Sequence, residues 1–490
     1  MQTFDEFDEP VQAFTGSVDV TRGFVKSEYT MTSTNSSASD PILPNSGRRT
    51  GLGALWNGVL QRTRLWHPWQ LFWLALAVRI AAMTLLRYYH VRPQDDHFEF
   101  GWEMGRIARA LVLGRGYADP FHGHTGPTAW VTPLYPLLLA TVFKVFGIYT
   151  AASAWVVLAI DCVLNALLVP LIWATGERVF LQPVGRWSAW IWALYPAAMQ
   201  FAVKWFWEMS LTALLLQAVL LLALIMRGVG SRPGDGPTWK RWLLFGLLWG
   251  ALALSNPGVL PFLPACGVWI LAAKGREWWR DFPKAFAAGL LFLAIVAPWT
   301  YRNWVALHAE LPLRSNLGAE LYLANGPGAT GIIMEYEHPN VDLTQYRLYA
   351  DMGEIAYTRW RGQLAEAEIR RDVPRFLRLC LTRVYFFWSG IPGASDKPFG
   401  NLGRGINSAG TSCAGLLGLA LALKRRRPAA GLIASAFLLF PLAYYAISAA
   451  ARFRHPLEPL IDLLGVYLFQ QAELRWGFSV FGPKRLAENA

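Results

Sequence analysis

The stretch "DDHFEFGWEMGRIARALVLGRGYADPF" (residues 95–121) places four carboxylates within nine residues, directly after an apolar run at 69–87. An apolar run of this length predicts a membrane-spanning helix. If residues 98–113 form a helix, Glu99, Glu103 and Arg106 lie on one strip and apolar side chains lie on a neighbouring face. The sequence therefore predicts an amphipathic helix at the membrane surface that carries acidic side chains.

The composition of the chain is that of a polytopic membrane protein. Of its 490 residues 54% are hydrophobic, only 16% are charged and 24 are Trp, whereas soluble domains are about 25% charged. The net charge of +12 comes from Lys and Arg in short connections between apolar runs, a pattern typical of membrane proteins. The sequence contains no basic stripe with interleaved aromatic residues, so we do not expect it to bind nucleic acid.

Ten apolar runs predict transmembrane helices, so we expect an all-α polytopic membrane protein. These runs are residues 69–87, 151–174, 187–203, 209–226, 241–255, 257–273, 284–301, 408–423, 429–449 and 457–471. A shorter run at 133–147 contains Lys144, and we expect it to lie along the outer membrane surface.

The distribution of Lys and Arg predicts which segments face outward. The basic connections are assigned to the cytoplasm by the positive-inside rule, and they are residues 177–186, 227–241, 274–284 and 424–427. Four segments then face outward, and they are the loop 88–150, the turn 204–208, the segment 302–407 and residues 451–459. In this orientation these four segments lie outside the cytoplasm.

The same patterns predict five regions along the chain. Residues 1–65 form a disordered or interfacial tail, and residues 66–301 form a membrane core that includes the external loop 88–150. Three further regions follow: a small external cap with an interfacial segment at 302–407, C-terminal transmembrane helices at 408–472 and a cytoplasmic tail at 473–490.

Charged side chains from distant segments are predicted to meet at the outer ends of the spans. Glu208 begins one span, Arg302 ends another, and Arg452 and Arg454 precede a third. An ionisable group at a span end is costly unless it has a partner or a task. Carboxylates for proton transfer and arginines for charge suit a lipid-phosphate site. The plainer alternative is a solvated surface helix on which Glu103 pairs with Arg106.

Several motifs, in this order, resemble the GT-C-type membrane glycosyltransferases, in particular bacterial glycosyltransferase family 39-like proteins. That family is related to protein O-mannosyltransferases and to lipid A aminoarabinose transferase. The motifs are "FGWEMGRIARAL" (100–111), "GYADPFHGHTGPTAWVTPLYPLLLATVFKVFG" (116–147), "KWFWEMSLTALLL" (204–216), "PWTYRNW" (298–304), "RSNLGAELYLANGPGATG" (314–331) and "RFRHPLEP" (452–459). The resemblance implies a polyprenyl-phosphate-linked sugar donor and an outward-facing active site.

The resemblance also implies roles for individual residues. The family's first-loop carboxylate maps near residues 99–103, and the family's Asp aligns with Phe100. Glu103 or Glu99 must therefore take its place, with Asp96 as a further candidate and Glu208 as a second acid or metal ligand. The candidate ligands of the donor phosphate are Arg302, Arg452, Arg454, His455 and Lys204, and the candidates for orienting the acceptor are His122, His124 and Asn325.

The expected function is transfer of a sugar from a polyprenyl-phosphate donor to a hydroxyl of a glycan, lipid or protein acceptor. Glu103 would act as the general base or would orient the acceptor. The sequence identifies no certain cofactor, and converging carboxylates leave a divalent cation open. A lipid-linked glycan flippase is the main alternative, and a non-catalytic scaffold is another. A flippase usually has repeated halves, and no internal repeat is present in the sequence.

Overall fold

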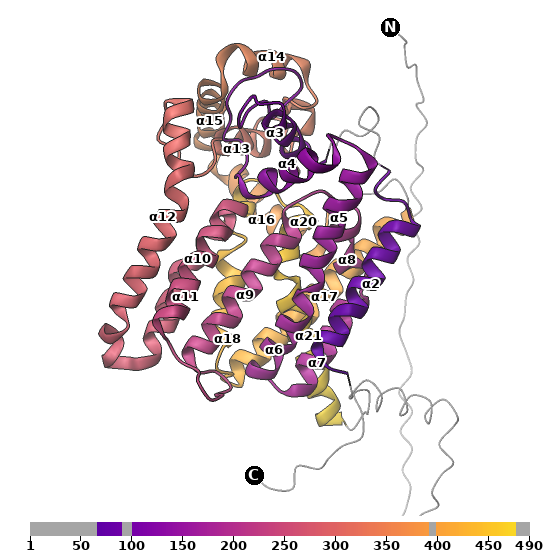
Figure 1. Cartoon of the computed structure of the whole chain (residues 1–490), viewed down its shortest axis with the longest axis vertical. Coiled ribbons are helices and arrows are strands. Elements are labelled where there is room, and N and C mark those ends of the chain that lie inside the picture. Colours follow the sequence, from indigo (N-terminus) through magenta and orange to yellow (C-terminus); the bar gives the residue numbers. More distant parts are fainter. Residues whose placement is uncertain (1–65, 91–99, 392–397, 477–490) are drawn as a thin grey trace, which may run out of the picture. The chain divides into compact units, whose positions relative to one another are not determined.

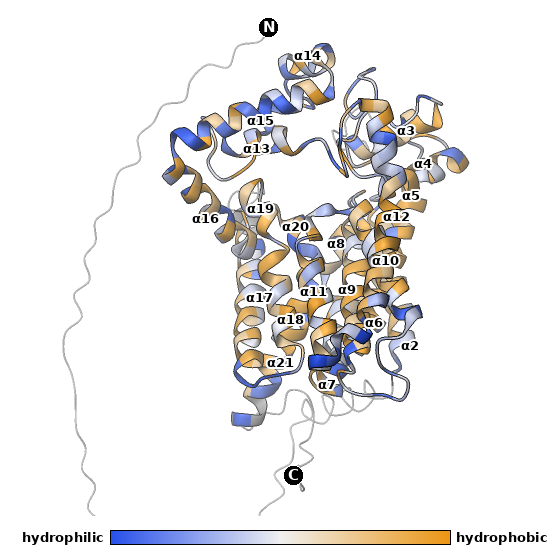
Figure 2. Ribbon diagram, turned by 90° about the vertical axis from the view of Figure 1, so that its left-hand side faces the viewer, coloured by the Kyte–Doolittle hydropathy of each residue, from blue (hydrophilic) through white to orange (hydrophobic). Residues whose placement is uncertain are grey.

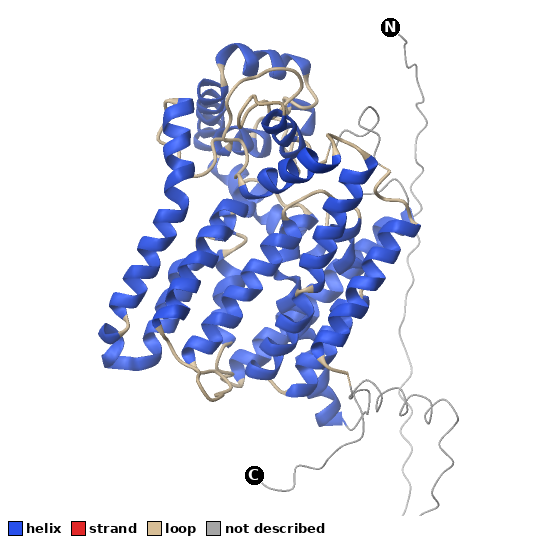
Figure 3. Ribbon diagram, viewed as in Figure 1, coloured by secondary structure: helices blue, strands red, loops and turns tan. Residues whose placement is uncertain are grey.

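The computed structural model describes residues 66–90, 100–391 and 398–476, all within the unit Trp56–Ala490. Helices make up almost all of the regular structure in these ranges, and the one β-bridge there joins Ala118 to Pro127 (Figure 3). The all-α prediction is therefore confirmed. The predicted tail 1–65 and most of the tail 473–490 lie outside the described residues.

Helices occupy all ten predicted spans, several of them as two consecutive pieces (Figure 1). The helices are α2 (Pro68–Leu85), α5 (Ala151–Ala166), α6 (Leu168–Val179), α7 (Gln182–Leu194), α8 (Pro196–Val203), α9 (Met209–Arg227), α10 (Trp239–Ser255), α11 (Phe262–Leu271), α12 (Phe282–Leu307), α17 (Pro398–Lys424), α18 (Ala430–Leu439), α19 (Leu442–Ala446) and α21 (Glu458–Trp476). In the described ranges, five helical segments are long and apolar enough to cross a membrane: Pro68–Leu85, Ala151–Val179, Met209–Arg227, Phe282–Leu307 and Leu402–Lys424.

Small residues allow neighbouring spans to pack closely. An ideal Cβ on Gly176 of α6 would lie 2.4 Å from the Cα of Gly185 on α7. Only glycine therefore fits at this contact between α6 and α7, as at many helix contacts in membranes. The exposed side chains of α12 are apolar and include Phe286, Leu290 and Leu293, as expected of a helix that contacts lipid.

One end of the bundle gathers the basic connections. The Arg178 guanidinium pairs with Asp235 at 2.8 Å, and Arg232 pairs with Glu177 at 2.8 Å. The ammonium of Lys284 donates to the carbonyl oxygen of Pro237 at 3.3 Å. These contacts join residues 177–186 to 227–241, and 227–241 to the start of α12. These three connections therefore lie at one end of the bundle, as their common assignment to one side of the membrane predicts.

The opposite end carries the predicted external segments, as Figures 1 and 2 show. They form α3 (Glu103–Val112), α4 (Leu134–Phe146), α13 (Leu317–Asn325), α14 (Leu343–Met352), α15 (Glu354–Arg371), α16 (Val373–Ser389) and α20 (Ala451–Arg454). The short run at 133–147 forms α4, which packs against α3. Three helices cross the predicted region boundaries, because α12 continues to Leu307, α17 begins at Pro398 and α21 continues to Trp476.

A buried carboxylate joins the cap to the first external loop. Glu354, at the start of α15, is 4% exposed. It accepts hydrogen bonds from the backbone N–H of Ala129 at 2.6 Å, the hydroxyl of Ser315 at 2.6 Å and the hydroxyl of Tyr349 at 2.7 Å. The hydroxyl of Thr128 donates a further hydrogen bond. Four donors satisfy this buried carboxylate, as a buried charge requires.

Candidate active site

The predicted amphipathic helix starts later than its periodicity indicates. Phe100, Gly101 and Trp102 have φ angles of 60°, 91° and 55°, and α3 begins only at Glu103. Positive φ is incompatible with a right-handed helix and is rare for bulky side chains. The prediction of a helix from residue 98 is therefore wrong, and Glu103 stands in the first turn of α3.

This sharp turn brings the first loop against residues 204–208. An ideal Cβ on Gly101 would lie 2.3 Å from the carbonyl oxygen of Phe206, so no side chain fits at position 101. The rings of Phe100 and Phe206 pack at a centroid distance of 4.5 Å. Glu103 and Glu208 each lie two residues beyond this contact, so it sets where both carboxylates stand.

Glu103 is largely shielded from solvent, with a side chain that is 13% exposed. The side-chain amide of Asn340 donates to its Oε1 at 2.6 Å, and Nε2 of His338 lies 3.8 Å from the same oxygen. Burial raises the pKa of Glu103, against the opposing charges of Arg106 and Arg452. Burial lowers the pKa of His338 to about 3, so this imidazole is neutral at physiological pH.

The alternative of a solvated Glu103–Arg106 pair is wrong, because Arg106 is only 1% exposed. Its guanidinium donates to the side-chain oxygen of Asn340 and lies 3.3 Å from Nε2 of His122. Arg106 and Glu103 therefore both contact Asn340, which belongs to the cap. The acidic helix of the first loop faces the interior of the protein at this point.

Two further carboxylates contribute charge to the same region. Glu208 immediately precedes α9 and is 5% exposed. Burial raises its pKa, opposed by the charges of Arg314 and Arg452. Glu320 lies on α13, and burial together with the charge of Glu103 raises its pKa to about 7, again opposed by Arg314 and Arg452. One buried carboxylate and two partly buried ones, Glu103 and Glu320, thus lie in the electrostatic field of the same two arginines.

No described residue occupies the N–H groups of these two arginines. Arg314 and Arg452 form no hydrogen bond or ion pair with any described residue, and the Nε of Arg314 is buried without a partner there. The guanidinium of Arg452 lies over the rings of Trp207 and Phe453, at 4.4 Å and 4.9 Å from their centroids. An arginine with unoccupied N–H groups beside carboxylates is suited to binding a phosphate.

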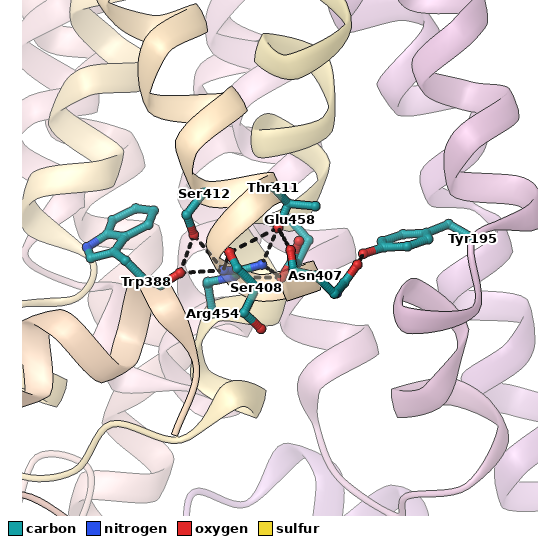
Figure 4. Close-up of polar contacts among 8 residues, drawn as sticks. All are labelled: Tyr195, Trp388, Asn407, Ser408, Thr411, Ser412, Arg454 and Glu458. Carbon is teal, nitrogen blue, oxygen red and sulfur yellow. Dashed lines mark hydrogen bonds and ion pairs between the residues drawn. The ribbon is translucent and has the colours of Figure 1, made fainter. Parts of the chain in front are cut away.

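Two other predicted phosphate ligands are occupied by the protein itself. Arg302 donates to the carbonyl oxygens of Tyr117 and Thr128, and thereby holds the first loop against α12. Arg454 is 4% exposed and pairs with Glu458 at 2.7 Å (Figure 4). It also donates to four acceptors that belong to Trp388, Ser408, Thr411 and Ser412. Its contacts join α20 to α16 and α17.

The remaining predicted residues lie in several places. His455 is buried in the bundle, where its Nε2 is 3.3 Å from the amide nitrogen of Asn165. Asn325 is buried and accepts from Arg383 at 3.1 Å. Lys204 is exposed and lies over the ring of Trp205. His124 is exposed and contacts Asp119 at 3.2 Å.

Asp96 and Glu99 fall outside the described residues. His122 is exposed beside Arg106, as described above.

Within the described ranges, no three His, Cys, Asp or Glu side chains are grouped closely enough to hold a metal ion.

Sequence reasoning missed the contribution of the cap to the site. Arg314 and Glu320 both lie in the motif at 314–331, from which only Asn325 was taken. Both residues could therefore have been considered from the sequence, because the motif that contains them had already been identified. His338 and Asn340 lie in a Pro- and Asn-containing turn that carries no periodic pattern, and only the fold brings them to Glu103.

Residues 130–302 match the family described as dolichyl-phosphate-mannose-protein mannosyltransferase. The chain is similar to this family over these residues. The match ends at Arg302 and includes the turn that carries Glu208. No curated protein matches the chain in sequence.

Solved structures of GT-C members are similar to the chain at low identity. Oligosaccharyltransferase of Archaeoglobus fulgidus with a tethered acceptor peptide is 13% identical, with a TM-score of 0.47, over 86% of this chain and 52% of that one. ArnT from Cupriavidus metallidurans bound to undecaprenyl phosphate is 14% identical, with a TM-score of 0.32, over 81% and 78%. The chain spans about half the length of the archaeal enzyme. The similarity to the mannosyltransferase family rests on the match of residues 130–302.

Proposed function

We propose that this chain is a membrane glycosyltransferase that moves a sugar from a polyprenyl-phosphate donor to a hydroxyl group of an acceptor. The observation that carries the proposal is the meeting of the buried Glu208 and the partly buried Glu103 and Glu320 with Arg314 and Arg452, two arginines that form no hydrogen bond or ion pair with a described residue. Proton transfer and stabilisation of a phosphate leaving group need these two kinds of side chain.

In the proposed reaction the acceptor oxygen attacks the anomeric carbon and the bond from that carbon to the phosphate oxygen breaks. Glu103 takes the proton of the acceptor hydroxyl, and its raised pKa makes it a better base than an exposed carboxylate. Asn340 holds Oε1 in place through its hydrogen bond. The electron pair passes to the phosphate oxygen, where Arg452 and Arg314 stabilise the growing charge.

Glu320 and Glu208 act as supporting acids in this proposal. Because the pKa of Glu320 is raised to about 7, a large share of this side chain is protonated at neutral pH and can donate a hydrogen bond. Glu208 balances the charge of Arg314 and Arg452 when no donor is bound. Neither side chain needs to leave its place for the transfer to occur.

The proposed donor is a polyprenyl-phosphate sugar, and the acceptor is a glycan, lipid or protein. Solved GT-C structures support a lipid-phosphate donor, since their descriptions include dolichol-phosphate and undecaprenyl phosphate. The site lies at the bundle end opposite the basic connections. By the positive-inside rule this end faces outward, and we place the protein in a bacterial inner membrane.

The test is sugar transfer by purified protein in proteoliposomes that contain a labelled polyprenyl-phosphate sugar and a mixture of glycan, lipid and peptide acceptors. We expect protein-dependent loss of label from the lipid. Glu103→Gln should abolish this loss, whereas the control Glu366→Gln, at a side chain that is 57% exposed on α15, should not. Movement of intact labelled lipid across the bilayer without cleavage would refute the proposal in favour of a flippase.

A further inference from the structure

A column of aromatic and cationic side chains lies beside the site. The indole rings of Trp205 and Trp207 stack in parallel, 4.7 Å apart with an interplanar angle of 2°. The ammonium of Lys204 lies 5.0 Å from the centroid of Trp205, and the guanidinium of Arg452 lies 4.4 Å from that of Trp207. The segment that begins α9 thus holds a cation at each end of two stacked rings.

The column continues beyond Arg452 into the bundle. The guanidinium also lies 4.9 Å from the centroid of Phe453, whose ring stacks on Tyr444 at 4.4 Å with an interplanar angle of 15°. The Tyr444 hydroxyl donates to the side-chain oxygen of Asn256 at 3.0 Å. The column is therefore anchored in the bundle at one end, at the N-cap residue of the 3-10 helix Pro257–Val259.

The chemistry of this arrangement differs from that at Arg454. An arginine that is oriented by a carboxylate gives up N–H groups and part of its charge to that partner. A ring face attracts the cation and fixes the plane of the guanidinium but leaves the N–H edge unoccupied. Arg452 has no hydrogen bond or ion pair among the described residues. Its donors remain available to an anion while its position is fixed.

The local backbone explains why Trp207 can take this place. Along residues 205–207 the side chains alternate, since Phe206 is 4% exposed and packs into the core while both tryptophans are partly exposed and stack together. Phe206 is also the residue whose carbonyl contacts Gly101. The same short segment therefore fixes Glu208, the first loop and the ring beneath Arg452.

We propose that Trp207 is a positioning residue that holds the Arg452 guanidinium for the lipid phosphate of the donor. This inference rests on the proposed function, because it takes a lipid phosphate to be the ligand of Arg452. It assigns to Trp207 an effect on donor binding that depends on Arg452. Trp205 supports Trp207 from the opposite face.

The experiment is a double-mutant cycle on binding of undecaprenyl phosphate, which carries no sugar, to purified full-length protein. The variants are Trp207→Leu, Trp207→Phe, Arg452→Ala and the combination of Trp207→Leu with Arg452→Ala. The control is Trp304→Leu, at a Trp that is 56% exposed on α12. We expect Trp207→Leu to weaken binding about 2- to 30-fold, the range of a cation–π contact, and Trp207→Phe to lose less. In the Arg452→Ala background, Trp207→Leu should have no further effect.

The outcomes separate this inference from the proposed function. If Arg452→Ala weakens binding but Trp207→Leu behaves as the Trp304→Leu control does, the positioning role is refuted and the phosphate site stands. Equal losses from Trp207→Leu with and without Arg452 also refute it, because the effect is then independent of the guanidinium. If Arg452→Ala leaves binding unchanged, both proposals fail. Should Trp207→Leu not fold, the same cycle with Trp207→Phe gives the decision.

Discussion

The motif "RFRHPLEP" contains two arginines with different roles. Arg454→Ala should mainly reduce folding stability, whereas Arg452→Ala should mainly reduce affinity for the donor. Arg454→Ala removes the partner of Glu458 and leaves four other acceptors without their donor. Breaking a buried ion pair in this way costs about 3–5 kcal/mol of folding free energy. Arg452 loses only ring contacts on truncation, worth about 1 kcal/mol.

The order reverses for donor binding. Each charge-assisted hydrogen bond from Arg452 to the phosphate contributes about 1.5–3 kcal/mol. One such bond corresponds to a loss of roughly 10- to 150-fold in affinity. Arg454 faces α16 and α17 rather than the three carboxylates, so folded Arg454→Ala should bind the donor nearly as wild type does (Figure 4).

Two assays on the same detergent-purified samples test whether Arg454→Ala mainly affects stability and Arg452→Ala mainly affects donor affinity. Thermal unfolding reports stability, and binding of undecaprenyl phosphate, measured well below the melting temperature of the weaker variant, reports affinity. We expect Arg454→Ala to lower Tm clearly and Arg452→Ala to leave it nearly unchanged. A folded Arg454→Ala with the larger loss of affinity would refute the division, as would an Arg452→Ala that binds as wild type does.

Three further outcomes follow from the site. Glu103→Gln should slow single-turnover transfer by about 10²- to 10⁴-fold at saturating donor, and a rate within about threefold of wild type would remove Glu103 from the mechanism. Gly101→Ala should abolish transfer, because its Cβ would meet the Phe206 carbonyl at 2.3 Å; normal activity in a folded variant would contradict the close approach. Because burial raises the pKa of Glu103 and Arg452 opposes this rise, kcat/KM should fall as pH drops through that pKa, and Arg452→Gln should move this acid limb to higher pH; a shift to lower pH would contradict the assigned charges.

The spans could be predicted from the sequence because their signal is local. Membrane helices need long apolar runs, and basic connections mark one end, so both features can be counted along the chain. Helix periodicity correctly placed Met104 and Ile107 on a buried face of α3, but it gave neither the start of the helix nor the burial of Arg106. The positive φ at Phe100 accompanies the packing of its ring against Phe206, which lies about a hundred residues away in sequence.

The candidate site was predictable in outline and not in its partners. Glu103 and Glu208 were chosen because an acid beside a span is conspicuous. The sequence does not distinguish Arg452 from Arg454, since both stand in one motif at the same kind of position. Only tertiary contacts show that one guanidinium is occupied and the other lies open over Trp207. Asn340 joins the site through contacts that span more than two hundred positions of sequence.

The hydrogen bonds between Glu354 and the first external loop can form only late in synthesis of the chain. Its hydrogen bonds to Thr128 and Ala129 join residues 226 and 225 positions apart, so the first loop leaves the ribosome long before its partner exists. Closing such a long loop also carries an entropic cost that local helices avoid. The first loop must therefore wait undocked, and a chain released before residue 354 could insert its early spans without assembling the place where Glu103 meets the cap.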